Sequence, residues 1–201
     1  MLPAAISLFC AFAGTWLWLH DRSVTAENHL LENSQAVFLA LAIALHIVQS
    51  ARTGDGAVRL FHLTLGLLCL SVLVREIDID KLGSAAIWNS MEVVVRLCVV
   101  LVWIVLGSYL LRHWEELWRR RLPLLISMNS FLVYLGIFFY MASWFFDKSV
   151  IPVNPDVSQL WEELLQLSAT VFFFVSALRP LSREARGEDR KCATAIAGHC
   201  L

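Results

Sequence analysis

Apolar residues dominate six long stretches of the chain, and short polar segments separate them. The stretches cover residues 3–20, 31–51, 58–76, 86–111, 122–146 and 158–178. Each is close to the roughly 20 residues that an α-helix needs to cross a bilayer. Continuous runs such as LFHLTLGLLCLSVLV lack the alternation of a membrane β-barrel. The pattern therefore predicts an all-α, polytopic membrane protein, a bundle of six transmembrane helices.

The composition supports placement in the membrane. Hydrophobic residues make up 58% of the 201 residues and charged residues only 16%, and the mean hydropathy is +0.66. A single soluble domain of this length cannot hide so much apolar surface. The net charge of -1 indicates nothing about partners, and nucleic-acid binding has no support in the sequence.

The first apolar stretch has two interpretations. The residues AFA at 11–13 resemble a signal-peptide cleavage site, but a basic segment before them is missing, and Trp16 and Trp18 extend the apolar run. We therefore expect 3–20 to be a retained helix, with cleavage as the alternative. The transmembrane domain then covers 1–180, and the tail 181–201 is expected to be cytoplasmic and partly disordered.

Arginine and lysine are shared unequally between the two sides of the predicted membrane. Loops 52–59 and 112–121 and the tail hold most of them. The loops of the opposite side hold only Arg22, Arg75, Lys81 and Lys148. The positive-inside rule thus places both termini in the cytoplasm, and we expect a bacterial inner membrane. Tryptophans near the predicted outer ends of the spans agree: Trp16, Trp18, Trp88, Trp144 and Trp161.

Acidic residues gather on the outer side. The segment VREIDIDK at 74–81 ends the third stretch with Glu76, Asp78 and Asp80. On a helix, Glu76 and Asp80 lie within about 40° of His62, whereas Asp78 points away. Acids at a helix C-terminus are mildly unfavourable, so these residues need another reason to be there. Glu76 is the strongest candidate for a functional carboxylate, while a solvated helix end is the better explanation of Asp78 and Asp80.

Polar residues also recur on one face of five predicted helices, whereas the first helix has almost none and is expected at the periphery. Ionised residues cost a few kcal/mol in hydrocarbon, so they usually face the bundle interior and pair there. Glu92 and Arg96, four residues apart, are the clearest pair. The candidates for a polar cavity or ion-binding site are Glu32, Gln35, Glu76, Asp80, Asn89, Glu92, Arg96, Glu162 and Glu163.

Two interpretations of these candidates remain open. Glu92 and Arg96 can form a structural ion pair that holds helices together. Alternatively the pair joins Glu76 and Glu32 in an outward-facing cavity. Carboxylates that come together repel one another, so at least one of them would hold a proton or share a cation. That chemistry suits proton coupling or a hard divalent cation.

His46 and His62 form a separate candidate pair. His46 lies about four residues before the end of the second stretch, and His62 about four after the start of the third. A tight antiparallel hairpin would put both at the same depth. Facing histidines can ligate haem or another metal. One pair is weak evidence for either, and the sequence favours hydrogen-bonded histidines.

Three functions are compatible with these residues. The chain has no GxxxxGK[ST], HExxH or GxSxG motif, so nucleotide-driven pumping and familiar hydrolase designs lack their signatures. The first function is small-solute or cation transport with proton coupling. The second is a metal-dependent enzyme that acts on a lipid at the outer leaflet. The third is a non-catalytic subunit whose polar stripes join helices. At 22.7 kDa, we expect a homo-oligomer or a membrane partner.

Overall fold

The structure, a computed structural model, describes residues 2–21, 30–77, 86–112, 124–147 and 154–179. The helices are α1 (Leu2–His20), α2 (Leu30–Arg52), α3 (Gly56–Glu76), α4 (Ala86–Arg112), α6 (Met128–Asp147) and α7 (Pro155–Leu178). Within the described ranges no strand occurs, and six helices are long and apolar enough to cross a membrane. The predicted all-α class with six candidate spans is confirmed, whereas the side on which the termini lie stays a prediction.

Side-chain hydrogen bonds cap the starts of three helices: α3, α7 and α6. Asp55 Oδ1 accepts hydrogen bonds from the main-chain N–H groups of Ala57 and Val58, at 2.8 and 3.4 Å, which fixes the start of α3. Asn154 Oδ1 accepts from the N–H of Asp156 at 2.9 Å, so α7 begins three residues before the predicted 158.

The fifth predicted span begins later than its apolar stretch does. Ser127 Oγ accepts a hydrogen bond from the N–H of Ser130 at 3.2 Å, which caps the new helix α6. Residues 124–126 form a separate helical turn before this cap. Hydropathy alone missed this break, because the residues on both sides of Ser127 are apolar.

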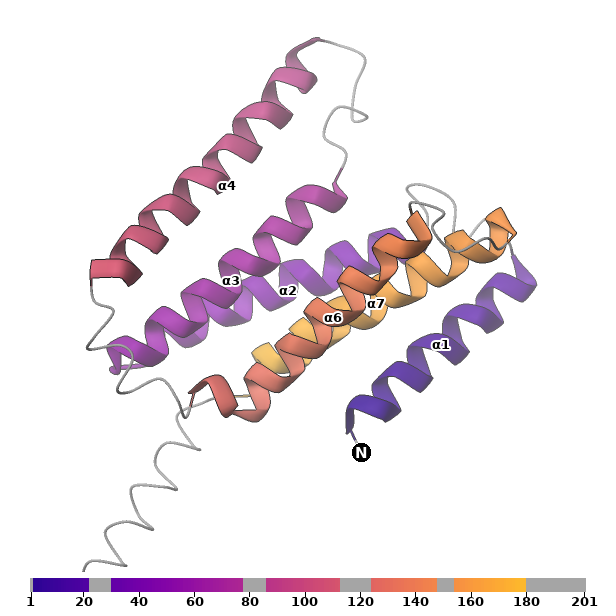
Figure 1. Cartoon of the computed structure of the whole chain (residues 1–201), viewed down its shortest axis with the longest axis horizontal. Coiled ribbons are helices and arrows are strands. Elements are labelled where there is room, and N and C mark those ends of the chain that lie inside the picture. The colour runs from indigo at the N-terminus through magenta and orange to yellow at the C-terminus, as the bar shows by residue number, and fades with distance from the viewer. Residues whose placement is uncertain (1, 22–29, 78–85, 113–123, 148–153, 180–201) are drawn as a thin grey trace, which may run out of the picture.

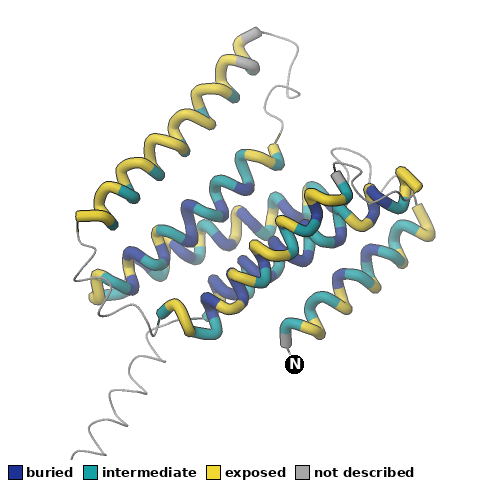
Figure 2. The backbone as a smooth tube through the Cα atoms, viewed as in Figure 1, coloured by how far each residue is buried: buried dark blue, intermediate teal, exposed yellow. Residues whose placement is uncertain are grey.

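Four helices, α2, α3, α6 and α7, form the core of the bundle (Figure 1). Helix α7 packs against α1, α2 and α6, and α2 also packs along α3. Large and small apolar side chains fill the space between them, including Leu39 and Ala42 of α2, Cys69 of α3, and Ala169 and Phe173 of α7. Figure 2 shows this buried stripe on the inward faces of the four helices.

The other two helices lie outside this core. Helix α1 packs along α7, where Gly14 faces Leu164. Its place outside the core agrees with the expectation drawn from its near lack of polar residues. Helix α4 packs along α3 and is set apart from the other helices (Figure 1), and none of the residues in Ser90–Arg112 is buried. A hydrogen bond from Trp103 Nε1 to Ser71 Oγ, 2.8 Å long, joins α4 to α3. The side chains of Ser90–Arg112 are therefore exposed or only partly buried.

Candidate functional site

Polar side chains lie at both ends of the four-helix core. We call the end where α2 and α7 begin and α3 and α6 end the glutamate end. The opposite end, where Arg52, Arg59 and Arg112 are exposed, is called the arginine end. The antiparallel order of the helices brings residues from distant parts of the sequence together at each end.

At the glutamate end, Gln35 joins α2 to α7. Its side chain is fully buried, and its Nε2 donates a hydrogen bond to Glu163 Oε2 at 2.7 Å and a longer one to the Glu163 main-chain oxygen at 3.4 Å. Among the described residues, Gln35 Oε1 is buried without a hydrogen-bond partner. The nitrogen of the Gln35 amide thus donates to a carboxylate, while its oxygen accepts no hydrogen bond from the described residues.

A second hydrogen bond at this end joins α6 to α3. The hydroxyl of Tyr140 donates to Glu76 Oε1. The guanidinium of Arg75 lies 5.1 Å from the centre of the Tyr140 ring, within the range of a cation–π contact. Tyr140 therefore binds a carboxylate with its hydroxyl and an arginine with its ring.

The glutamates of the two hydrogen bonds lie in one electrostatic environment. Glu163 interacts electrostatically with Glu162, Glu76 and Glu32, which come from α7, α3 and α2. Gln166 Nε2 donates to Glu162 Oε1 at 3.3 Å. We call this set the glutamate network: Glu32, Gln35, Glu76, Tyr140, Glu162, Glu163 and Gln166. It contains five of the residues that the sequence singled out.

The remaining candidates lie elsewhere. Arg96 Nη2 is 2.5 Å from Glu92 Oε1, so the predicted ion pair forms within α4. The Arg96 side chain is 53% exposed and that of Glu92 is 15% exposed. Because α4 packs along α3 and stands apart from α2 and α7, participation of this pair in a common cavity stays a prediction. Asp80 and the side chain of Asn89 lie outside the described residues.

His46 and His62 face each other near the arginine end, at the same depth. Their Nδ1 atoms are 3.1 Å apart, and both side chains are buried. Such a bond needs one protonated and one unprotonated nitrogen, so the two rings adopt different tautomers. His46 Nε2 is buried and has no hydrogen-bond partner in the described part of the chain. Gly66 lies beside this pair, where a Cβ would be in van der Waals contact with His46 Cβ at 3.4 Å.

His46 and His62 were the weak candidates for metal ligands. Among the described residues, no group of three or more histidine, cysteine, aspartate or glutamate side chains is placed to hold a metal ion. His46 and His62 form a hydrogen bond with each other through their Nδ1 atoms.

Two amides at the arginine end were not predicted as site residues. Gln49 Nε2 donates to the main-chain oxygen of Ala177, and Asn129 Nδ2 donates to that of Arg179 at 2.8 Å. They satisfy carbonyl groups at the C-terminus of α7 that have no partner within the helix. Their role is to fix the end of α7 against α2 and α6.

Tyr140, Gln166 and Arg75 were likewise not among the candidate site residues. Tyr140 and Gln166 lie on the polar faces of their helices, so helical periodicity was the available signal. Nothing in the sequence indicated that Tyr140 would meet Glu76, which lies 64 positions away.

The comparisons with known proteins add no relative: no protein-family model matches the chain, and neither a curated protein nor a solved structure matches it.

Proposed function

We propose that this integral membrane protein binds protons at the glutamate network and couples their uptake and release to the transport of a small solute or cation. The observation that carries the proposal is the partly buried hydrogen bond between Gln35 and Glu163, with three further glutamates within electrostatic range of Glu163. We further propose that both termini are cytoplasmic, so that the glutamate end faces outward.

Charge supports the proposal. The network brings four carboxyl groups together, and Arg75 contacts it through the ring of Tyr140. Ionised groups in or near hydrocarbon are costly, and like charges in a medium of low dielectric constant repel strongly. Binding a proton, or a cation in its place, relieves that repulsion.

The hydrogen-bonding groups of the network suit two protonation states. When Glu163 is ionised, Gln35 Nε2 donates to its carboxylate. When Glu163 holds a proton, its O–H is a new donor, and Gln35 Oε1 is a buried acceptor that the described residues leave unpaired. A buried unpaired acceptor costs about 1–3 kcal/mol, so gaining this bond favours the protonated state. Gln35 is thus suited to stabilise either state.

Transport also needs a closed layer in the protein and a site that is accessible from one side of the membrane at a time. Leu39, Ala42 and Phe173 belong to the apolar core between the glutamate network and the histidine pair. Because these side chains pack against one another, the described core residues leave no continuous polar path through this layer. We therefore expect movement of helices, as in transporters that alternate access to one central site.

The second candidate is a subunit of a larger membrane complex. The exposed α4, with no buried residue in Ser90–Arg112, favours it. Co-purification of a partner in fixed stoichiometry with a tagged chain would support this function.

The proposal is tested by infrared difference spectroscopy during a pH change on purified protein. We expect the carbonyl band of a protonated carboxyl group in the wild-type protein and its loss in Glu163→Gln. The matched control is Asp156→Asn, which changes an exposed acid in the first turn of the same helix. Proteoliposomes with a pH dye inside and a sodium or potassium gradient then report coupled flux. Equal bands and equal flux in wild-type protein and a folded Glu163→Gln variant would contradict the proposal.

A further inference from the structure

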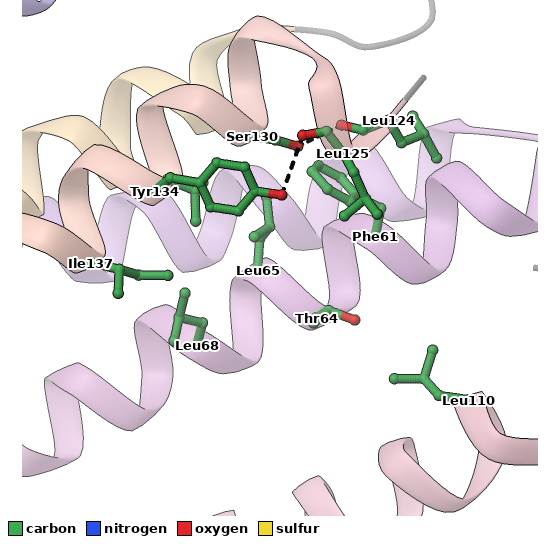
Figure 3. A pocket seen from close by; sticks show the side chains of 11 residues that line it. Phe61, Thr64, Leu65, Leu68, Leu110, Leu124, Leu125, Ser130, Tyr134 and Ile137 are labelled. Carbon is green, nitrogen blue, oxygen red and sulfur yellow. Dashed lines mark hydrogen bonds between the residues drawn. The ribbon is translucent and has the colours of Figure 1, made fainter. Parts of the chain in front are cut away.

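An apolar cavity of about 260 Å³ lies between α3, α4 and α6, away from the glutamate network (Figure 3). Its apolar walls include Phe61, Leu65 and Leu68 of α3, Leu110 of α4, and Val133 and Ile137 of α6. Leu110 is the contribution of α4, and Figure 3 shows it on the side of the cavity opposite α6. The cavity therefore lies where α4 stands away from the core.

The hydroxyl groups beside this cavity are already engaged. Tyr134 donates to the main-chain oxygen of Leu125 at 3.2 Å, and Thr64 donates to that of Leu60 at 2.9 Å. Ser130 Oγ donates to the main-chain oxygen of Leu124 at 2.5 Å. The occupant consequently receives few hydrogen bonds from the walls, so the part of it that enters must be apolar.

Part of the cavity wall is exposed, at Leu125, Tyr134 and Ile137. The cavity can therefore be reached from the outer surface of this membrane-spanning chain, where the bilayer supplies hydrocarbon chains. An acyl chain is the apolar occupant that is always present at such a surface.

The position of the cavity indicates the charge of the molecule that carries this chain. Its walls come from the beginning of α3 and α6 and the last turns of α4, which meet at the arginine end. Arg59 in the first turn of α3 and Arg112 at the end of α4 are exposed there. Within the described ranges, Asp55 is the acid at this end, and its carboxylate caps α3. Basic residues between transmembrane helices attract anionic lipid headgroups.

We propose that the cavity binds one acyl chain of an anionic phospholipid, whose phosphate lies among the arginines of this end. Long arginine side chains at helix ends extend toward the headgroup region, so Arg59 and Arg112 need not line the cavity to bind the phosphate. The bound lipid fills the space between α3 and α4 and supplies the packing that α4 otherwise lacks. This inference does not depend on the transport proposal.

The test uses purified full-length protein in nanodiscs of equal parts phosphatidylglycerol and phosphatidylcholine, followed by native mass spectrometry of the retained lipid. We expect phosphatidylglycerol in preference to phosphatidylcholine. One arginine near a membrane surface contributes about fivefold to such binding, so Arg112→Gln should lower the retained phosphatidylglycerol about fivefold. Arg59→Gln should act in the same direction.

Filling the cavity should remove the lipid. Thr64 lines the cavity, whereas its neighbour Leu63 is exposed and does not. We expect Thr64→Phe to lose the retained phosphatidylglycerol and the matched control Leu63→Phe to keep it. Ile137→Trp fills the cavity from α6 and replaces Thr64→Phe as the test if circular dichroism shows that the first variant does not fold.

Three results would overturn the inference. The first is equal retention of the two lipids by the wild-type protein. The second is retention in the folded cavity-filling variants that matches Leu63→Phe. The third is a fall in oligomer mass in those variants with unchanged lipid, which would assign the cavity to a second copy of the chain.

Discussion

The side-chain amide of Gln35 donates a hydrogen bond to the carboxylate of Glu163 across 128 positions of the sequence, and so ties the first turns of α2 to those of α7. The bond lies beside three other glutamates that interact with Glu163. The group that donates to the Glu163 carboxylate is a neutral amide. An arginine in its place would neutralise the negative charge of the carboxylate. Under the proposed function, this neutral partner leaves Glu163 able to bind and release a proton.

Replacing Gln35 should weaken the contact between α2 and α7. Hydrogen bonds to charged groups contribute about 1.5–3 kcal/mol, so we expect Gln35→Leu to lower the free energy of unfolding by about 2 kcal/mol. Thermal unfolding in detergent measures the change. The control is Gln166→Leu, which removes a longer bond of 3.3 Å within α7 alone. An equal loss in both variants would show that Gln35 does not join the two helices.

Removal of the Tyr140 hydroxyl should affect Glu76. Tyr140→Phe keeps the partly buried ring but leaves the Glu76 carboxylate without this donor, so we expect a loss of about 1.5–3 kcal/mol. Tyr134→Phe is the control, because its hydroxyl donates to a neutral main-chain oxygen at an exposed position. A larger loss of stability in Tyr134→Phe than in Tyr140→Phe would contradict this assignment.

Gly136 should tolerate no side chain where α6 meets α7. A Cβ there would lie 2.6 Å from Phe173 Cε1, and Phe173 is itself almost fully buried. Overpacking of this kind costs about 1–3 kcal/mol, so Gly136→Ala should lower the unfolding temperature. Gly107→Ala on α4 should not, because no described atom outside the adjoining turns of α4 lies within 4 Å of a Cβ placed there, and alanine favours a helix. The two variants differ only in packing, and equal melting temperatures would refute the predicted contact.

Asp55 should stabilise the start of α3 through its side chain. Asp55→Ala removes the acceptor for the N–H groups of Ala57 and Val58, and we expect a loss of about 1 kcal/mol. Asp55→Asn should retain most of the stability, because asparagine is also a favoured cap. Chemical denaturation of the purified protein distinguishes the two. Loss of the same size in Asp55→Asn would indicate that the charge matters and the cap does not.

The orientation of the chain can be tested with reporter fusions. We expect a fluorescent reporter that folds only in the cytoplasm to be active when fused to either terminus, and inactive in the loop 78–85. The basic loops 52–59 and 112–121 are the reason, because they are expected to remain on the cytoplasmic side. Activity of the reporter in the loop 78–85 would reverse the proposed topology.

The helices could be predicted from the sequence because the signal for each one is local. Length and hydropathy alone locate the six spans, and spacing alone puts His46 opposite His62 across a short hairpin. The start of α6 was harder to predict, because a serine cap changes the backbone without changing hydropathy.

The packing partners of the polar residues could not be predicted in the same way. Helical periodicity shows that Tyr140 and Glu76 lie on polar faces, but the rotation of α6 against α3 decides whether those faces meet. Likewise, the Glu92–Arg96 spacing predicts their ion pair, whereas the loose packing of α4 depends on tertiary contacts that no local pattern encodes.

The apolar layer between Gln35 and His46 has an electrical consequence. Eleven residues of helix separate these two side chains, which corresponds to about 16 Å, or about half of the hydrocarbon thickness. A charge carried across this layer would pass through about half of the membrane potential and exchange about 1 kcal/mol with it at 100 mV. Transport of net charge through this bundle would therefore depend on voltage, and its rate would report how far along α2 the charge moves.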